Sequence, residues 1–316
     1  MFNYTMKRLL QAFVTVLIVV TIVFLLLRLL PTDYYFTETQ LLKFTDQQKY
    51  DMLKAAGYND PPMEQLFRYY GQLLKLDFGE SRRIQNGVAV TTLIGTKFSV
   101  SMRFGLISLG ISLFLGISMG IIQTRFKDKF FDYLGTAYTI FVNAVPSLVS
   151  YSLILVFGSR ILHLPSLYSV KDTTASSILP LICLSMGSIA GYALWTRRYM
   201  VDEINKDYIK LARVKGMSGK KIMVHHVLRN AFVPLAQYLP ASFLLTIGGS
   251  LLVERFFSIP GMGPLLTDSI SRYDLPVVQT LVILYASLGI LGVFLGDLLM
   301  AIIDPRIKLV DKGGTR

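Results

Sequence analysis

"LLQAFVTVLIVVTIVFLLLRLL", residues 9–30, decides the class of fold to which this chain belongs. The stretch holds 22 residues, of which only Arg28 is charged. A transmembrane α-helix needs about 20 apolar residues to cross the roughly 30 Å of hydrocarbon in a bilayer. Lys7 and Arg8 precede the stretch as they would in a secretory signal, but it is too long for such a signal and no small-x-small cleavage site follows. We therefore predict an uncleaved first transmembrane helix.

Further apolar stretches follow the first along the chain. They cover Phe98–Ile122, Leu134–Phe157, Ser177–Met200, Leu235–Val253 and Val277–Ile303. Hydrophobic residues make up 53% of the chain and charged residues 16%, which excludes an ordinary soluble domain. The sequence thus predicts an all-α polytopic membrane protein with six transmembrane helices. Its parts would be residues 1–30 with the first helix, a loop at 31–97, and a five-helix core at 98–316 that contains a charged loop at 200–235. Glycines at positions 187, 191, 248 and 249 are expected at close contacts between helices.

The distribution of Lys and Arg predicts the orientation. If the N-terminus is inside, the inner segments hold 18 Lys and Arg and the outer segments hold 12, of which eight lie in the 31–97 loop. Long loops escape the positive-inside bias, so the relevant comparison is 18 against four. Both termini are therefore expected in the cytoplasm. The same bias accounts for the formal charge of +12 without any nucleic acid partner.

The 31–97 loop, predicted to be extracytoplasmic, has the pattern of short helices. Thr45 is a plausible N-cap of a helix that ends near Ala56, where Gly57 can stop it. Pro61 and Pro62 can open a second helix. Its apolar side chains recur at helical spacing, at Leu66, Tyr69, Tyr70 and Leu73. We expect the loop to form an ordered cap at the membrane surface.

A second stretch, "DYIKLARVKGMSGKKIMVHHVLRNAFVP" at residues 207–234, concentrates the charge of the inner side. Its first half has a basic face and a partly apolar face at helical spacing. The basic face comprises Lys206, Lys210 and Arg213, and the other comprises Tyr208, Leu211 and Ala212. Gly216 can end this helix and Ser218 can cap a second one. An amphipathic hairpin of this kind docks into a partner protein or lies on anionic lipid, and the glycine turn favours a partner.

These residues resemble the cytoplasmic coupling loop of binding-protein-dependent ABC importers, in the branch that transports dipeptides, oligopeptides or nickel. The pattern "DY-x-x-x-A-x-x-KG" followed by "LRNA-x-x-P" is present, although Lys210-Leu211-Ala212 replaces the general E-A-A triplet. "LDFGES", "VERFFSIPGMGPLL", "DLP" and "DPRI" resemble other signatures of this branch, in the same order along the chain. The long first outer loop is similar to the "B" type of permease subunit.

The resemblance implies a type I ABC importer permease fold and a subunit without enzymatic activity of its own. The chain would form half of a heterodimeric pore with a second permease, and an extracytoplasmic binding protein would deliver peptides, oligopeptides rather than dipeptides. Two partner ATPases would bind ATP and Mg²⁺, because no G-x-x-x-x-G-K-[ST] motif occurs in this chain. The predicted coupling residues are Asp207, Tyr208, Lys210, Leu211, Ala212, Arg213, Lys215, Gly216, Arg229 and Asn230.

Other polar residues are candidates for the transport path and the outer face. The predicted path residues are Asn143, Ser147, Ser242, Thr246 and Ser250, and the predicted outer gate or loop comprises Glu254, Pro260 and Gly261. Asp297, an acid within the sixth span, is expected to pair with polar groups inside the bundle. No metal site or cofactor is expected on this chain, since the three histidines, His163, His225 and His226, lack a cluster of partner ligands.

Three alternatives stay open at this level. The permease could carry nickel chelates or other small solutes, which travel through similar subunits. It could be a stand-alone secondary transporter, which predicts several intramembrane acids where the predicted spans supply Asp297. A membrane-embedded enzyme would require a convergent cluster of His, Asp and Glu within the spans, and the sequence offers none.

Overall fold

The computed structural model describes residues 2–303, apart from the side chains at 2–4, 38, 247 and 301. Within that range the chain is built of helices, and no β-strand is present there. Five helical stretches are long and apolar enough to cross a membrane: Thr5–Arg28, Val90–Arg125, Thr173–Ile204, Gly219–Phe256 and Leu275–Met300. They confirm five of the predicted spans. The predicted "DPRI" motif, Asp304–Ile307, lies outside the described residues.

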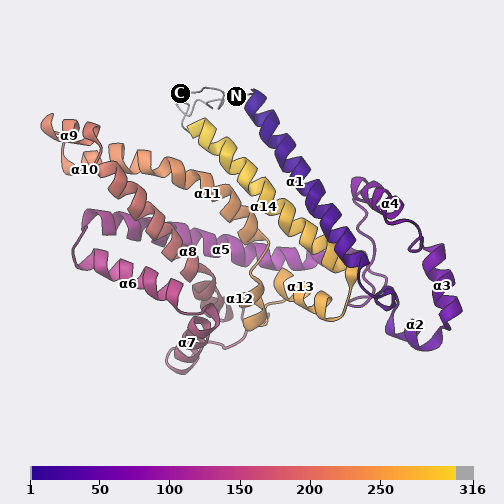
Figure 1. Ribbon diagram of the computed structural model, residues 1–316. Helices are drawn as coiled ribbons and strands as arrows, with labels where there is room; N and C mark the ends of the chain where they lie inside the picture. Colours follow the sequence, from indigo (N-terminus) through magenta and orange to yellow (C-terminus); the bar gives the residue numbers. More distant parts are fainter. Residues whose placement is uncertain (1, 304–316) are drawn as a thin grey trace.

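The elements follow one another along the chain as Figure 1 shows. They are α1 (Phe2–Arg28), the 3₁₀ turn η1 (Thr32–Tyr35), α2 (Glu38–Lys43), α3 (Asp46–Ala55), α4 (Pro62–Leu74), α5 (Val90–Arg125), α6 (Phe130–Ala144), α7 (Ser147–Arg160), α8 (Thr173–Ile204), α9 (Asp207–Val214), α10 (Gly219–Lys221), the π-helical turn η2 (Ile222–Leu228), α11 (Arg229–Ile247), α12 (Leu251–Phe256), α13 (Met262–Ser271) and α14 (Leu275–Ile303).

The third predicted span, Leu134–Phe157, is a bent pair of helices rather than one continuous helix. α6 and α7 replace it and are bent by 113° relative to each other. Val145 lies between them in an extended conformation, with ψ of 129°. Pro146 causes this, because its ring disfavours the helical conformation of the residue before it. Six spans are reached only if this bent pair is counted as one.

Small residues allow the long helices to pack closely. A Cβ on Gly116 of α5 would lie 2.9 Å from the carbonyl oxygen of Ile189 in α8, and one on Gly296 of α14 would lie 2.2 Å from that of Gln237 in α11. Of the glycines predicted at such contacts, Gly248 lies against Tyr285, and Gly249 lies against Glu254 and Ser101. Gly187 and Gly191 have open space around them, so for these two the prediction was wrong.

Asp297 of α14 joins three helices at one end of the bundle. Its Oδ1 accepts a hydrogen bond of 3.0 Å from Gln237 of α11, and its Oδ2 lies 3.4 Å from a guanidinium nitrogen of Arg8 in α1. This confirms the expectation that Asp297 pairs within the bundle. It also brings the start of α1, the last part of α14 and the first half of α11 to the same end, which Figure 1 shows together with the marked termini.

The α1–α5 loop, residues 29–89, is ordered as predicted. Thr45 caps α3 with a reciprocal hydrogen-bond pair to Gln48, and Gly57 follows the helix with φ of 72°. Pro62 is the first residue of α4. α4 packs along α1, where the Tyr70 hydroxyl is 2.6 Å from that of Thr21. The loop therefore forms a cap at the far end of α1 rather than an extended tether.

One buried carboxylate fastens this loop to the start of α14. Asp274 is fully buried and accepts hydrogen bonds from the Ser81 hydroxyl at 2.6 Å and from the backbone N–H groups of Arg82, Arg83 and Ile84 at 2.9 to 3.2 Å. We call this arrangement the Asp274 clamp. It unites two of the quoted sequence motifs, "LDFGES" and "DLP", which lie 193 residues apart at the Ser81–Asp274 contact.

Candidate functional site

Residues 206–231 form a compact hairpin, here named the α9 hairpin, beyond the end of α8 (Figure 1). α9 ends at Val214, and Gly216 reverses the chain with φ of 76°, a conformation that L side chains rarely adopt. The Ser218 hydroxyl then accepts a hydrogen bond from the backbone N–H of Lys221 and caps the second helix. The predicted helix, glycine turn and capped helix are all present, and the second helix continues through a π-helical turn into α11.

The hairpin has its own apolar core. Ile209 is fully buried and Ala212 is 6% exposed. They pack in one cluster with side chains from α8, η2 and α11, namely Met200, Ile222, Val227 and Ala231. Ala212 therefore faces the interior of the hairpin, and the predicted apolar outer face of Tyr208, Leu211 and Ala212 is wrong in this one position. Ile209, which the sequence interpretation omitted, takes the inward position three residues earlier.

Two apolar side chains of α9 stay outside this core. Leu211 is 54% exposed and Val214 is 84% exposed. Their spacing of three residues puts them on one face of the helix. Val214 was not among the predicted coupling residues, although its i+3 spacing from Leu211 marks it. The exposed cations Lys210, Arg213 and Lys215 alternate with them along the chain, so the outer surface of α9 combines an apolar pair with positive charge.

Polar contacts fix the first turn of α9. The Lys210 amino group lies 2.8 Å from Asp207, and this hydrogen bond holds the pKa of the exposed Asp207 carboxyl below its ordinary value. Tyr208 donates a hydrogen bond to Glu203 and accepts one of 2.7 Å from the amide of Asn230. Partial burial and the bond to Glu203 raise the pKa of Tyr208. Tyr208 and Asn230 therefore link α8, α9 and α11.

Arg229, also a predicted coupling residue, is exposed at the first position of α11. All four predicted coupling cations, Lys210, Arg213, Lys215 and Arg229, therefore lie on the exterior of the hairpin. The predicted set therefore divides in two. One part holds the hairpin together, and the other part is presented outward.

The predicted path residues occupy different local settings. Ser242 lines a cavity of about 220 Å³ between α8 and α11, together with Ser188, Gly191, Tyr192, Trp195, Leu235 and Tyr238. Ser250 caps α12 through the backbone N–H of Val253, and the Thr246 carbonyl packs against Gly105. On the bent pair, Asn143 donates to the Thr139 carbonyl at 2.7 Å, and Ser147 is exposed at the start of α7. Ser242 is thus the predicted path residue that borders a cavity.

Glu254, predicted at an outer gate or loop, is 1% exposed and lies inside a tight turn. Its Oε2 accepts a hydrogen bond of 2.8 Å from the Gly263 N–H, and its Oε1 accepts one of 3.3 Å from the Ser250 N–H. A Cβ on Gly261 would lie 2.3 Å from Glu254 Oε2, so only glycine fits there. Pro260 is exposed beside it. Glu254 and Gly261 therefore form the interior of the α12–α13 turn, and Pro260 forms its surface.

One further buried ion pair was missed by the sequence interpretation. Asp132 of α6 is 3% exposed and meets Arg197 of α8 through two hydrogen bonds of 2.6 and 2.7 Å. The sequence interpretation counted Arg197 among the Lys and Arg of the inner segments and did not consider Asp132. The guanidinium and the carboxylate form a bidentate pair, but the two residues lie 65 positions apart, so a single sequence does not show that they meet. Among residues 2–303, no group of three His, Cys, Asp or Glu side chains is arranged to hold a metal ion.

Comparison with known proteins identifies the class. Residues 112–309 match the family described as "binding-protein-dependent transport system inner membrane component", and the chain belongs to that family. Family membership and the apolar helices together make it a multi-pass membrane protein of a bacterial transport system. A family defined by dependence on a binding protein gives no support to the stand-alone secondary transporter.

Two of the relatives match over nearly the whole length of the chain, and a third matches over two thirds of it. The dipeptide transport system permease protein DppB of Lactococcus lactis subsp. cremoris is 32% identical over 309 residues, which cover 98% of this chain and 100% of that protein. The oligopeptide transport system permease protein OppB of Escherichia coli K12 is 32% identical over 314 residues, with the same two coverages. The oligopeptide permease AmiC of Streptococcus pneumoniae TIGR4 is 38% identical over 212 residues, covering 66% of this chain and 42% of that protein.

Proposed function

We propose that this chain is one permease subunit of an ATP-driven peptide importer. The full-length similarity to dipeptide and oligopeptide permeases is the observation that supports peptides as the cargo. These relatives do not favour nickel chelates. We expect oligopeptides to be preferred over dipeptides, which a competition assay with peptides of two and six residues tests directly.

The orientation that we propose has both termini and the α9 hairpin in the cytoplasm, and the α1–α5 loop outside. Two independent observations support it. Lys and Arg are in excess on the segments assigned to the inside, as the positive-inside rule requires. The contacts of Asp297 with Arg8 and Gln237 join the start of α1 to the end of the bundle where α11 emerges from the hairpin.

In this proposal each of two ATPases docks on the α9 hairpin of one permease subunit. Leu211 and Val214 would enter an apolar groove on the ATPase, and Lys210, Arg213, Lys215 and Arg229 would complement acidic residues around it. The exposed apolar pair supports this assignment, because the hairpin core is complete without it. ATP and Mg²⁺ would be bound by the ATPases.

The hairpin would act as a rigid lever between ATP hydrolysis and the spans. Ile209 and Ala212 lock α9 onto α8 and α11, so a displacement of α9 moves both spans. A second, homologous permease subunit would complete the pore. The face that carries Trp195, Tyr238 and Ser242 is our candidate for the peptide path, because these side chains line the cavity between α8 and α11. An extracytoplasmic binding protein would deliver the peptide at the opposite end.

The test is a double variant in the reconstituted transporter, Leu211→Ser with Val214→Ser. Copurification of the ATPase subunits and peptide uptake should both fall at least tenfold, while the permease inserts normally. The matched control is Leu74→Ser with Leu76→Ser, two exposed leucines of the α1–α5 loop, which should leave ATPase binding intact. Retained ATPase binding in the Leu211/Val214 variant would contradict the docking assignment. Uptake by the chain alone, without ATP, would overturn the proposed function.

Genes beside this one give a second test that needs no protein. A second six-span permease, an ATPase with a Walker A motif and a secreted binding protein in neighbouring reading frames are expected. An isolated gene would count against the proposal.

A further inference from the structure

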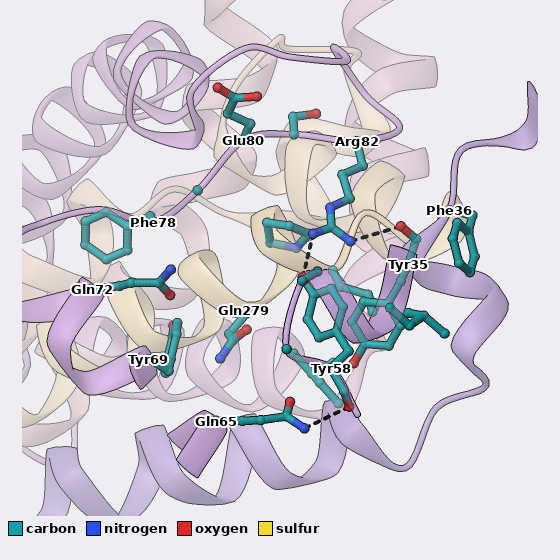
Figure 2. A pocket seen from close by; sticks show the side chains of 18 of the residues that line it. Tyr35, Phe36, Tyr58, Gln65, Tyr69, Gln72, Phe78, Glu80, Arg82 and Gln279 are labelled. Atoms are coloured by element: carbon teal, nitrogen blue, oxygen red, sulfur yellow. Dashed lines mark hydrogen bonds between the residues drawn. The ribbon is translucent and has the colours of Figure 1, made fainter. Parts of the chain in front are cut away.

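The α1–α5 loop, the end of α1 and the start of α14 enclose a cavity of about 590 Å³, which we name the loop cavity (Figure 2). It lies beside the Asp274 clamp, on the side of the molecule opposite the α9 hairpin (Figure 1). Its walls come from segments distant in sequence, such as Phe24 of α1, Tyr58 and Tyr69 of the loop, and Gln279 of α14. A volume of this size falls within the range of pockets that hold small organic ligands.

Two amide groups on its wall have atoms without partners. Gln65 is 6% exposed, and its Nε2 donates to the carbonyl oxygens of Tyr58 and Asp60 at 2.8 and 2.6 Å, which fixes the orientation of its amide. Its Oε1 is buried and accepts no hydrogen bond within the described residues. The buried Nε2 of Gln279 likewise has no acceptor there. A buried polar group without a partner is costly, so a ligand that supplies the missing partners is bound more tightly.

The unmatched pair is one acceptor and one donor. A peptide group offers the complement of both, because its N–H can donate to Gln65 Oε1 and its carbonyl can accept from Gln279 Nε2. Gln65 presents its Oε1 in the orientation that its two hydrogen bonds fix, whereas the terminal torsion of Gln279 is soft and can rotate its amide toward an incoming group. Figure 2 shows Gln65 and Gln279 on the wall of the same space.

Positive charge lies at the same cavity. Arg28 donates to the Tyr35 hydroxyl at 2.8 Å, and Arg82 donates to the Tyr58 hydroxyl at 2.6 Å and to the Tyr35 carbonyl at 3.0 Å. Among the described residues neither guanidinium forms an ion pair with a carboxylate. The third arginine on the wall, Arg68, is neutralised by Asp60 at 2.6 Å. Even with the exposed Glu80 on the wall, the cavity retains a net positive charge that suits a carboxylate.

Aromatic rings complete the lining. The Arg28 guanidinium lies 4.8 Å from the centre of the Phe24 ring and 4.7 Å from that of Tyr58, so cation and rings form one continuous surface. Burial raises the pKa of Tyr35 and of Tyr69, which keeps both phenols neutral. Such rings favour the apolar side chains of a ligand rather than a small inorganic anion.

We infer that the loop cavity binds a short peptide through its free C-terminal carboxylate, as a station on the outer side of the permease that is separate from the pore. The arginines Arg28 and Arg82 would receive the carboxylate, and Gln65 and Gln279 would hold a peptide group. The inference rests on the proposed function for its peptide and its orientation. A phospholipid headgroup also carries a negative charge, but it lacks the amide that the two glutamines require.

The experiment uses the complete transporter in nanodiscs of neutral lipid, without its binding protein. The probe is the tripeptide Ala-Phe-Ala, and its C-terminal amide is the matched ligand. The amide should bind about tenfold more weakly, as expected for the loss of a charge-assisted contact. Gln279→Met should weaken tripeptide binding about fivefold, the effect of one hydrogen bond. Arg28→Gln should remove the preference for the free carboxylate.

Arg272→Gln is the control variant, because it removes the same charge from an exposed position near the start of α14 that does not line the cavity. It should bind the tripeptide like the parent protein. Equal binding by Arg28→Gln, Gln279→Met and the parent would place any peptide elsewhere and overturn the inference. Loss of peptide binding in a second set of nanodiscs, prepared with anionic phospholipid, would assign the cavity to a headgroup and overturn the inference too.

Photolabelling keeps the inference testable if a variant fails to fold. Ala-Phe-Ala with p-benzoylphenylalanine at its centre should label the loop, with Met52 on the cavity wall as the expected site. Labelling confined to α8 or α11 would contradict the inference. Uptake of Ala-Phe-Ala by the transporter with its binding protein is measured in parallel. Uptake without binding to the cavity rejects this inference alone, whereas absence of any uptake rejects the proposed function as well.

Discussion

The α9 hairpin and the Asp274 clamp hold their segments by different means. Apolar packing around Ile209 holds the hairpin, and its charged side chains point outward. A single buried carboxylate holds the α1–α5 loop, through four neighbouring hydrogen-bond donors. Apolar packing is not directional, so the hairpin leaves its polar surface free for a partner. A buried carboxylate must be met by hydrogen-bond donors in defined directions. The motif residues of the clamp supply these donors, so they interact within the chain itself.

Sequence signatures of one family can therefore have different roles in the protein. In "DYIKLARVKG", Ile209 and Ala212 are buried in the core of the hairpin, whereas Leu211 and Val214 are exposed on its surface. "LDFGES" and "DLP" meet inside the protein at Ser81 and Asp274. Substitution in the first should act mainly on the partner complex. Substitution in the second should act mainly on the fold of this chain.

Asp274→Ala should have the largest effect on stability, about 3–5 kcal/mol, because it leaves several buried donors without an acceptor. The measurement is hydrogen exchange at the amides of residues 82–84, which should lose their protection. Asp268→Ala is the control, since Asp268 pairs with Arg255 at the exposed surface. That change should cost less than about 1 kcal/mol. Protection that survives in Asp274→Ala would show that the clamp does not hold the loop.

Ile209→Ala should destabilise the hairpin by about 2–5 kcal/mol, because it opens a cavity in a fully packed cluster. Thermal unfolding in detergent, monitored at Trp195 of α8, reports the loss. Leu211→Ala, two residues further along the same helix, should change stability by no more than about 0.5 kcal/mol. The opposite order of the two effects would mean that the two faces of α9 are assigned the wrong way round.

Gly216→Val should strain the turn by about 1–2 kcal/mol, since φ of 76° is costly for a residue with a Cβ. The expected result is peptide uptake that falls further than ATP hydrolysis, measured side by side in proteoliposomes. Gly219→Ala is the matched control, because it lies in the same hairpin with open space around it and without a positive φ. Unchanged coupling in Gly216→Val would remove the turn from the mechanism.

The smallest effect concerns the exposed pair of Asp207 and Lys210. Lys210 lowers the pKa of the Asp207 carboxyl, so the pair supports the start of α9 above the ordinary carboxyl pKa of about 4. This support is lost as the pH falls through the lowered value. A carboxyl titration followed by NMR should show the pKa of Asp207 rising in Lys210→Gln. An unchanged titration would mean that the pair does not form in solution.

Local features of the sequence predicted much of the fold. Apolar length gave the positions of five spans, and Thr45, Gly57, Pro62, Gly216 and Ser218 marked the ends and turns of helices. These predictions succeeded because each depends on backbone conformation or transfer energy within a few residues. Apolar length also marked the position of the third span, but not the 113° angle between its two helices, α6 and α7.

Composition and short-range pattern determined the class of this protein, its helices and the existence of the α9 hairpin. Three features depend on long-range packing: which side of α9 faces outward, the binding of the α1–α5 loop by Asp274, and the enclosure of Glu254 in a turn. Helical periodicity shows which residues share a face of a helix, but it does not show which of two partly apolar faces is buried. A hydrogen bond from a distant backbone N–H to a buried carboxylate produces no pattern in the sequence, because every residue except proline has the same backbone donor.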